Sequence, residues 1–365
     1  MWGKKIVIIA VLLYSGVVGC VMWSSSPASQ QGEVSPNEPA ISLAPIQGLK
    51  PYRGVAIQLQ RVDWVSEYEK TIDAAAADGA DTVSLVVDSR QENKESLEMY
   101  VDMRKTMTVP QLTEIIGHAR GMGLRVILMP IVLLDAPIKD EWRGQLDPRE
   151  GKWHDWFENY RDMISHYARV AESTHVDVLV VGSELVSSEK HADEWIETIK
   201  TVRQIFHGRL TYSSNWDRYE KVPFWNYLDF IGMNSYWTLG EDHTATVEQI
   251  NRSWAGIQKK IFEFQRTVHK PLILLEAGWC SLSNSAKDPW DYTRDDLDTD
   301  NDLQRRLYEG FFQSWWGKPQ LAGFVLWEMH PGGDPSGKGY TPQGKPAEQV
   351  MRDWLRKPVW EVASE

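Results

Sequence analysis

Cysteine is scarce in this chain, with two residues, Cys20 and Cys280, among 365. Cys20 falls in an N-terminal segment whose composition differs from the rest, so we expect no internal disulfide in the remaining chain. The part after residue 50 spans roughly 310 residues, enough for one large domain whose core needs no disulfide. The cysteine content therefore leaves export open. Cys280 is expected to be a small buried residue.

The chain carries a net negative charge, and it also lacks recognisable metal-binding motifs. The net charge of -12 argues against nucleic acid as a partner, because its binders need basic patches that displace counterions. No His/Cys cluster has zinc-ligand spacing. Residues 291–302 hold six aspartates but lack the turn glycine and closing glutamate of an EF-hand loop, and we interpret them as a solvated acidic loop. We therefore expect no metal and no cofactor.

Tryptophan, by contrast, is abundant, with 18 residues. A tryptophan packs in the core or presents a flat apolar ring to a ligand, including the face of a sugar. Most of these side chains are expected in the core and a handful along a groove.

The N-terminus is expected to direct or anchor the protein. Residues 1–23 combine two lysines with an apolar run, as in a signal peptide. One interpretation is a bacterial lipoprotein signal in which Cys20 is lipidated; the other is an uncleaved anchor, because residues 6–23 are about long enough to span a bilayer. Both place the following domain outside the cytoplasm, in the cell envelope or secreted, with membrane contact through this segment alone. Residues 24–50 are rich in Ser, Pro, Gln and Ala and predict a flexible linker.

From residue 51 onward, apolar strand-like runs alternate with segments of helical period. The predicted strands are residues 54–59, 82–87, 125–130, 176–181, 210–214, 230–234, 271–275 and 321–326. The predicted helices are residues 64–78, 109–122, 153–173, 192–206, 247–268, 303–316 and 347–356, with at most a turn of helix near 219–227. Eight βα units predict an α/β fold, a single (β/α)8 TIM barrel over residues 51–358, followed by a C-terminal tail at 359–365. A doubly wound open sheet is the alternative, but no glycine-rich phosphate loop follows the first strand.

Two of the apolar runs end abruptly in a carboxylate, Glu184 after residues 178–183 and Glu276 after residues 272–275. A carboxylate is not expected inside a strand that is buried on both faces, so each should lie at a carboxyl end, in a cleft. Taken singly, each could be an ion-paired structural residue. Taken together, they suggest acid/base and nucleophilic work on a glycosidic bond.

The active site of a TIM barrel lies at the carboxyl ends of its strands, so the residues there form the candidate list. The further candidates for substrate binding are Gln58, Asp88, Arg90, Asn215, Trp216, Asn234, Tyr236, Trp237, Trp279 and Trp327. Amides and carboxylates bond hydroxyls while aromatic faces cover a ring, so this set predicts a carbohydrate partner. We expect Glu328 to point away from whatever Trp327 faces, and His330 to be a satisfied loop histidine. Asp88 and Arg90 could instead pair with each other at the rim.

A barrel with a glutamate ending the fourth strand and another ending the seventh resembles the retaining β-glycosidases of clan A. Within that clan, residues 181–185 and 275–279 are most similar to the family 113 β-mannanases, and the resemblance covers roughly residues 50–358. It implies that Glu184 is the acid/base and Glu276 the nucleophile. It also implies that Tyr236 hydrogen-bonds the nucleophile and that Trp327 floors the subsite where cleavage occurs. The implied activity is hydrolysis of a β-linked polysaccharide or oligosaccharide, with β-mannan the best single guess.

One position departs from the clan. Most members carry Asn directly before the acid/base, where it holds the sugar 2-hydroxyl, and here that residue is Ser183. Asn215 or Asn234 could take that role. Tyr236 and Arg90 are expected to help push the pKa values of the two glutamates apart. The departure leaves a second interpretation open, a catalytically inactive, carbohydrate-binding envelope protein. We expect a monomer.

Overall fold

Eight parallel strands form a closed barrel in the computed structural model, which describes residues 48–294 and 296–362. Each strand pairs with the next along the chain, and the last pairs with the first. The strands are β1 Tyr52–Gln58, β2 Thr82–Gln91, β3 Arg125–Leu134, β4 Val178–Ser183, β5 Arg209–Ser214, β6 Ile231–Asn234, β7 Leu272–Ala277 and β8 Leu321–Leu326. The predicted (β/α)8 barrel is confirmed.

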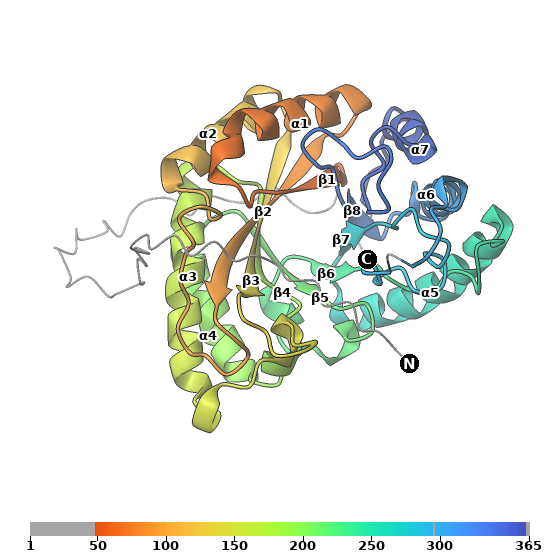
Figure 1. Cartoon of the computed structure of the whole chain (residues 1–365). Coiled ribbons are helices and arrows are strands. Elements are labelled where there is room, and N and C mark those ends of the chain that lie inside the picture. Colours follow the sequence, from red (N-terminus) through yellow and green to blue (C-terminus); the bar gives the residue numbers. More distant parts are fainter. Residues whose placement is uncertain (1–47, 295, 363–365) are drawn as a thin grey trace, which may run out of the picture.

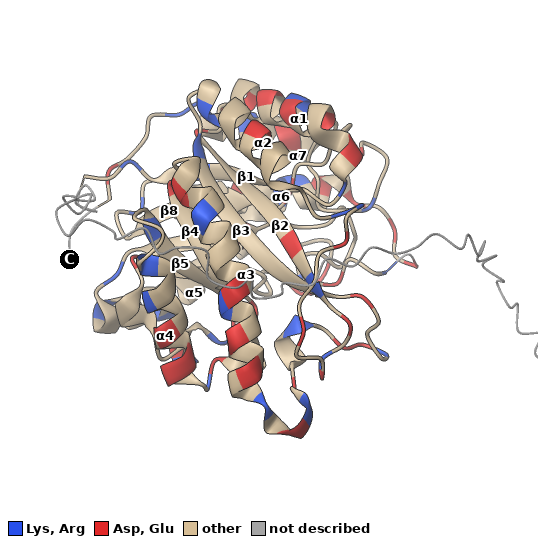
Figure 2. Cartoon of the chain, turned by 90° about the vertical axis from the view of Figure 1, so that its left-hand side faces the viewer, with Lys and Arg blue, Asp and Glu red and all other residues tan. Residues whose placement is uncertain are grey.

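Helices surround this barrel (Figure 1). They are α1 Val65–Asp78, α2 Val109–Gly121, α3 Trp153–Ser173, α4 Ala192–Arg203, α5 Val247–Val268, α6 Asn301–Trp315 and α7 Pro346–Leu355. The β5–β6 connection contains two short 3-10 helices, η5 Tyr219–Lys221 and η6 Trp225–Tyr227, where at most one turn of helix was predicted. Charged residues lie mainly on the outer helices and loops (Figure 2).

Local sequence signals explain where several helices begin and end. Thr246 caps α5, because its hydroxyl accepts from the Gln249 N–H at 3.3 Å and the Gln249 side chain accepts from the Thr246 N–H at 2.8 Å. At the end of α1, Gly79 takes φ 102°, a left-handed conformation that glycine adopts without steric cost.

Two layers of buried side chains hold the barrel together. Inside it lies a cluster of alternate strand residues, such as Val86, Met129, Val180 and Leu275. A larger cluster lies between the strands and the helices. The barrel interior is therefore a packed core and not a pore.

Two strands run further than the apolar pattern predicts. β2 and β3 remain paired along ten residues each, from Thr82 with Arg125 to Gln91 with Leu134. The second half of β2 is polar, so it carries no apolar signal. It stays extended because it pairs with β3 and because Arg90 exchanges two backbone hydrogen bonds with Tyr100, each 2.8 Å.

The predicted signal or anchor segment 1–23 and most of the predicted linker lie outside the described residues. Within the described part, no helix is long and apolar enough to cross a membrane. Near the C-terminus, Val362 is buried and its backbone pairs with Gly48 and Leu49, both at 3.2 Å. The end of the described chain thus packs against the segment that leads into β1.

Candidate active site

A cleft of about 730 Å³ lies at the carboxyl ends of the strands. Residues from most of the βα connections meet there. Its lining comprises Gln58, Ile131, Leu133, Trp142, Arg143, Glu184, Asn215, Trp216, Asp217, Asn234, Tyr236, Glu276, Trp290, Tyr292, Trp327, Glu328 and Tyr340. The two glutamates that the sequence singles out therefore share one cleft.

Glu184 directly follows β4 in an uncommon backbone conformation. Its φ of 57° is left-handed, which is unfavourable for a residue with a β-carbon and persists when the surroundings hold it. Its backbone N–H donates to the carbonyl of Ser213 on β5 at 2.8 Å. Its carboxylate accepts from Arg143 Nη2 at 2.5 Å and from the side-chain amide of Asn234. The turn thus aims the carboxyl group across the cleft toward β6.

Glu276 lies within β7, one residue before the strand ends, and its exposed fraction is 4%. The Tyr236 hydroxyl donates to its Oε2 at 2.9 Å, and the Ser235 hydroxyl donates to its main-chain carbonyl at 2.8 Å. Oε1 is buried and has no hydrogen-bond partner among the described residues. One carboxylate oxygen is therefore fixed while the other stays free on the cleft side.

The surroundings of Glu276 change how tightly it holds its proton. Burial and the negative charge of Glu184 raise the pKa of Glu276 above that of an ordinary carboxyl group, while Arg143 and the hydrogen bond from Tyr236 oppose this rise. The net effect is a raised pKa, so the Glu276 carboxyl group holds its proton more tightly than a free glutamate does.

The end of β6 links both glutamates. Asn234, the last residue of β6, is in register with Glu276, and its side chain donates to Glu184. Its side-chain oxygen accepts from the backbone N–H of Trp216 at 2.8 Å, which fixes the amide orientation. Tyr236, two residues later, bonds Glu276. One short segment thus sets the relative position of the two carboxyl groups.

A polar wall stands where β1 and β8 end. Gln58, the last residue of β1, donates to Glu328 Oε2 at 2.7 Å, and the Gln60 amide donates to the Gln58 side-chain oxygen at 2.9 Å. Burial raises the pKa of Glu328. The peptide bond between Trp327 and Glu328 is cis.

The expectation that Glu328 points away from the side Trp327 faces is wrong, since both line the cleft. The reason is that β8 ends at Leu326, so strand alternation does not extend to these two residues. His330 does not line the cleft; its ring nitrogen contacts the Pro331 carbonyl at 2.9 Å, as expected of a loop histidine.

Aromatic side chains from the connections after β5, β7 and β8 form another wall of the cleft. The rings of Trp216 and Trp290 stack at 5.9 Å with an interplanar angle of 20°. Next to them Tyr292 packs near Tyr340. Trp290 and Tyr292 have exposed fractions of 44% and 65%, high values for such large apolar rings. This wall offers flat surfaces that suit the faces of sugar rings.

Asp88 and Arg90 lie elsewhere than expected. Both are buried within β2 and neither lines the cleft. They form an ion pair of 2.7 Å, and Arg90 also pairs with Asp135 from the end of β3. The alternative prediction, that Asp88 and Arg90 pair with each other, is therefore confirmed. Arg143, and not Arg90, supplies the positive charge beside the two glutamates.

Two of the predicted tryptophans also face away from the cleft. Trp279 has an exposed fraction of 0% and packs against Trp254, Tyr308 and Phe311 in the layer between strands and helices. A fully covered ring cannot stack on a ligand, so this expectation is corrected. Trp237 is partly buried against the same core and supports Trp216 edge-on at 5.9 Å.

The other sequence candidates, Gln58, Asn215, Trp216, Asn234, Tyr236 and Trp327, do line the cleft. Ser183 is buried and does not, and its hydroxyl has no hydrogen-bond partner within the described residues. Asn215 brings a buried side-chain oxygen that likewise lacks a partner among them. The side-chain amides of Asn215 and Asn234 therefore line the cleft, whereas Ser183 does not. Cys280 is buried, as predicted.

Several lining residues escaped the sequence analysis, notably Trp142, Arg143, Trp290, Tyr292 and Tyr340. All lie in irregular connections well beyond a strand end, where no periodic signal exists. Among the described residues, no group of His, Cys, Asp and Glu side chains could hold a metal ion.

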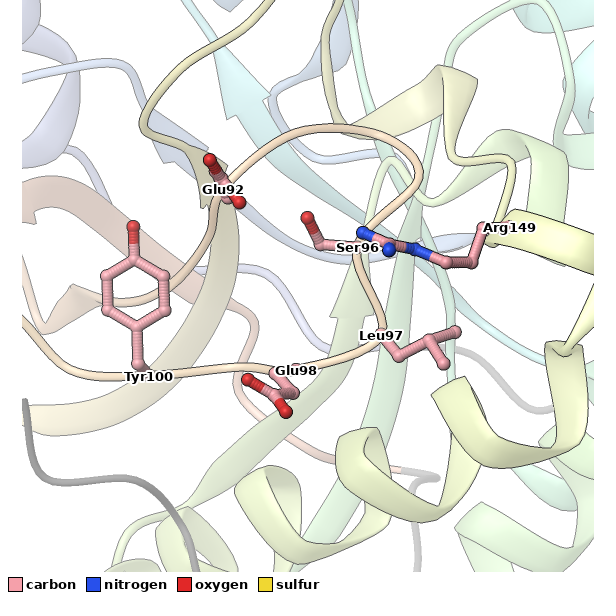
Figure 3. Close-up of a pocket in the computed structure, with 6 residues that line it drawn as sticks. All are labelled: Glu92, Ser96, Leu97, Glu98, Tyr100 and Arg149. Carbon is pink, nitrogen blue, oxygen red and sulfur yellow. The ribbon is translucent and has the colours of Figure 1, made fainter.

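A second hollow of about 310 Å³ lies outside the cleft. Figure 3 shows the six residues that line it: Glu92, Ser96, Leu97, Glu98, Tyr100 and Arg149. The Arg149 N–H donates to the Glu95 carbonyl at 3.1 Å, which joins the β2–α2 and β3–α3 connections. The hollow is thus formed by two loops and shares no lining residue with the cleft.

A closed (β/α)8 barrel with one glutamate directly after β4 and another near the end of β7, both lining one cleft, defines the class of (β/α)8 glycoside hydrolases. Comparison with known families identifies the family within that class. The model of Glycoside Hydrolase Family 113 matches residues 56–336, and the chain belongs to this family. It is a glycoside hydrolase, and the resemblance to clan A seen in the sequence is confirmed.

Solved structures agree with this assignment. The chain is similar to a family 113 β-1,4-mannanase determined as a complex, with a TM-score of 0.76, 24% identity and coverage of 85% of this chain and 100% of that one. It is also similar to the family 113 β-mannanase from Alicyclobacillus acidocaldarius in complex with ManMIm, with a TM-score of 0.75, 28% identity and coverage of 84% and 97%. A family 5 mannosidase from Rhizomucor miehei shares the fold at a TM-score of 0.62 and 9% identity, over 84% and 92% of the two chains. None of the curated protein sequences matches the chain.

Proposed function

We propose that this chain is a retaining β-mannanase that cleaves β-linked mannan by double displacement, with Glu184 as acid/base and Glu276 as nucleophile. The observation that carries the proposal is the pairing of the two glutamates in one cleft. Each has a distinct set of supports, Tyr236 on Glu276 and both Arg143 and Asn234 on Glu184. Two carboxyl groups in different environments can have different pKa values, so that one acts as the nucleophile and the other as the acid.

In the first step, ionised Glu276 attacks the anomeric carbon of the sugar bound over Trp327. Its Oε1 is the oxygen available for attack, since Oε2 accepts from Tyr236. Glu184 gives its proton to the departing glycosidic oxygen, so the leaving sugar departs neutral. A covalent glycosyl-enzyme ester on Glu276 results.

In the second step, the leaving sugar makes room for water. Glu184, now ionised, takes a proton from this water as it attacks the anomeric carbon, and Glu276 departs as a carboxylate. Two inversions at one carbon give net retention. The mechanism requires the two carboxyl groups to lie about 5–5.5 Å apart.

The first step requires a proton on Glu184 and an ionised Glu276. Burial and the charge of Glu184 raise the pKa of Glu276, whereas the Arg143 charge and the hydrogen bond from Tyr236 favour its ionised form. At a pH where Glu184 carries no proton, no acid remains and the first step fails.

Support for mannan as substrate comes from the similar proteins, since the two family 113 structures are described as a β-1,4-mannanase and a β-mannanase. The cleft adds a second line of support. Its aromatic wall includes the stacked rings of Trp216 and Trp290, which suits a chain of several sugar units. The alternative of an inactive carbohydrate-binding barrel lacks such support from the comparisons.

The test is a panel of β-mannan, glucomannan, β-glucan and xylan assayed for released reducing ends. We expect release from β-mannan and glucomannan, with the β-anomer formed first when the products are followed by NMR. Glu184→Gln should lose release but still bind mannan. Release from none of the four polysaccharides would contradict the proposal, and formation of the α-anomer first would contradict the retaining mechanism.

We also propose that the barrel works outside the cytoplasm, tethered by its N-terminal segment. The support is the sequence of residues 1–23, with its lysines, apolar run and Cys20. Fractionation of cells that express the full chain and a Cys20→Ser variant tests this. Recovery of the full chain in the cytoplasmic fraction would contradict it.

A further inference from the structure

We propose that Tyr212 and Glu189 are positioning residues that clamp the turn after β4 and so hold the Glu184 carboxyl group where it can protonate a leaving group. This inference rests on the proposed role of Glu184 as acid/base. Neither residue lines the cleft, so both act through the backbone that carries Glu184.

The turn needs external support. Glu184 is held in a left-handed conformation with φ 57°, which is unfavourable for a residue other than glycine. The strand also changes register here, with an irregularity in the β4–β5 pairing between Val180 and Ser183. A carboxyl group on such a turn keeps its position only when the next peptide group is fixed.

The two peptide groups that flank the Leu185 α-carbon are each fixed by a buried side chain. The Leu185 N–H donates to the Tyr212 hydroxyl at 3.0 Å, and the Ser188 hydroxyl donates to the Leu185 carbonyl at 2.7 Å. Ser188 is in turn held by the indole N–H of Trp195 at 3.2 Å. The residue after Glu184 is therefore locked by side chains of β5 and of its own turn.

Glu189 completes the clamp. The Tyr212 hydroxyl donates to Glu189 Oε1 at 3.1 Å, so the phenol receives from Leu185 and gives to Glu189. Such a chain of hydrogen bonds orients each member. Glu189 has an exposed fraction of 2%, and its Oε2 has no hydrogen-bond partner among the described residues. A buried carboxyl group of this kind is costly, which is consistent with a functional role.

Its charge is not neutralised by a salt bridge among the described residues. The groups that act on it are Tyr212 from β5 and, from the β5–β6 connection, Arg218 and Asp217. Burial raises the pKa of Glu189 to about 7, against which Tyr212 and Arg218 act. Protonation of Glu189 still leaves an oxygen that accepts from Tyr212.

The test uses the chemistry of the leaving group. A sugar departs poorly without a proton, whereas 2,4-dinitrophenolate departs without one, so a misplaced acid slows only the first. We compare kcat/KM for mannotetraose and for 2,4-dinitrophenyl β-mannobioside. Tyr212→Phe should lower the value for mannotetraose roughly 10- to 100-fold, as expected for a small displacement of an acid. The value for the aryl glycoside should change little.

The matched control is Tyr160→Phe. Its side chain is equally buried and its hydroxyl donates to the Val181 carbonyl on the same strand at 2.7 Å, rather than to any of residues 184–189. The Tyr160→Phe substitution should leave the ratio of the two kcat/KM values unchanged. Glu189→Leu removes the acceptor and should reproduce the Tyr212→Phe ratio, whereas Glu189→Gln keeps an acceptor and should stay close to wild type. These two variants also carry the test if Tyr212→Phe fails to fold.

Equal losses on both substrates, or a Tyr160→Phe ratio that matches Tyr212→Phe, would overturn the inference in favour of a purely structural role. Failure of the proposed function looks different, because the wild-type enzyme would then hydrolyse neither mannose-based substrate.

Discussion

The hydroxyl of Tyr236 donates a hydrogen bond of 2.9 Å to Oε2 of Glu276. Both groups are buried, and the bond leaves Oε1 of the same carboxylate without a partner in the described part of the chain. A donor on one oxygen stabilises the ionised form while leaving the second oxygen to react. Several expectations about this site depend on that bond.

Replacement of Glu276 by Gln is expected to lower turnover on mannan by on the order of 10³-fold or more, equivalent to at least about 4 kcal/mol in the barrier. The amide is of the same size but cannot form the covalent intermediate. Initial rates of release and circular dichroism check this. Wild-type rates in the variant would remove Glu276 from the proposed mechanism.

The same substitution is expected to change how stability depends on pH. Because the folded protein raises the pKa of Glu276, it holds this proton more tightly than the unfolded chain. Below the unfolded carboxyl pKa of about 4.3, both states are protonated and the group contributes no penalty. As pH rises above that value, the wild type should lose free energy of unfolding relative to Glu276→Gln. Urea unfolding of both proteins between pH 4 and pH 8 measures the difference; parallel curves would contradict it.

Replacement of Tyr236 by Phe is expected to move the acidic limb of the kcat/KM profile to higher pH. Loss of the donor raises the pKa of Glu276 further, so less of the nucleophile is ionised. We expect a loss of about 10- to 100-fold at neutral pH, equivalent to about 1.4–2.7 kcal/mol. Tyr340→Phe is the control, because that hydroxyl also borders the cleft but donates to the Pro289 carbonyl at 2.8 Å. The control should keep the acidic limb in place.

The positive charge of Arg143 is expected to influence the pH at which the acidic limb of the kcat/KM profile lies. Its guanidinium pairs with Glu184 at 2.5 Å and lowers the pKa of Glu276. Arg143→Gln removes this charge, so the acidic limb should again move to higher pH, whereas Arg143→Lys should move it less. Profiles of kcat/KM for the three proteins decide this. An unchanged limb in Arg143→Gln would show that the ion pair is incidental.

The barrel could be predicted because its strands are buried on both faces and therefore appear as apolar runs. Counting those runs also placed Glu184 and Glu276 on one rim, since the carboxyl ends of parallel strands face the same way. The directions of neighbouring side chains could not be predicted in this way. Trp216 and Trp279 both follow strands, yet the first lines the cleft and the second is packed under helices.

The connections were still harder to interpret. Arg143 and Trp290 reach the cleft from irregular segments whose paths are set by contacts with distant parts of the chain. Arg90 illustrates the opposite error, because it lies near a strand end but pairs with Asp88 and Asp135. Whether a side chain reaches the cleft therefore depends more on the path of the connection that carries it than on its distance from the strand end.

The aromatic wall is expected to bind substrate units remote from the bond that breaks. Trp290 and Tyr292 are exposed, and Trp290 is aligned by stacking on Trp216. Truncation of either to Ala should weaken binding of long mannan by about 0.5–1.5 kcal/mol, which is roughly two- to tenfold in affinity. KM should rise for the polymer while kcat stays near wild type, since the contact exists before and during reaction.

Chain length provides the internal comparison for this prediction. A disaccharide glycoside that does not reach the wall should be cleaved equally well by the wild type and by Trp290→Ala. Tyr227→Ala is the matched control, because Tyr227 on η6 is also 44% exposed but does not line the cleft. Steady-state kinetics on mannan and on mannobiose glycosides distinguish the outcomes. A fall in kcat on the short substrate would place Trp290 among the groups that act on the reacting sugar, and equal KM values on mannan would show that the wall makes no contact with the chain.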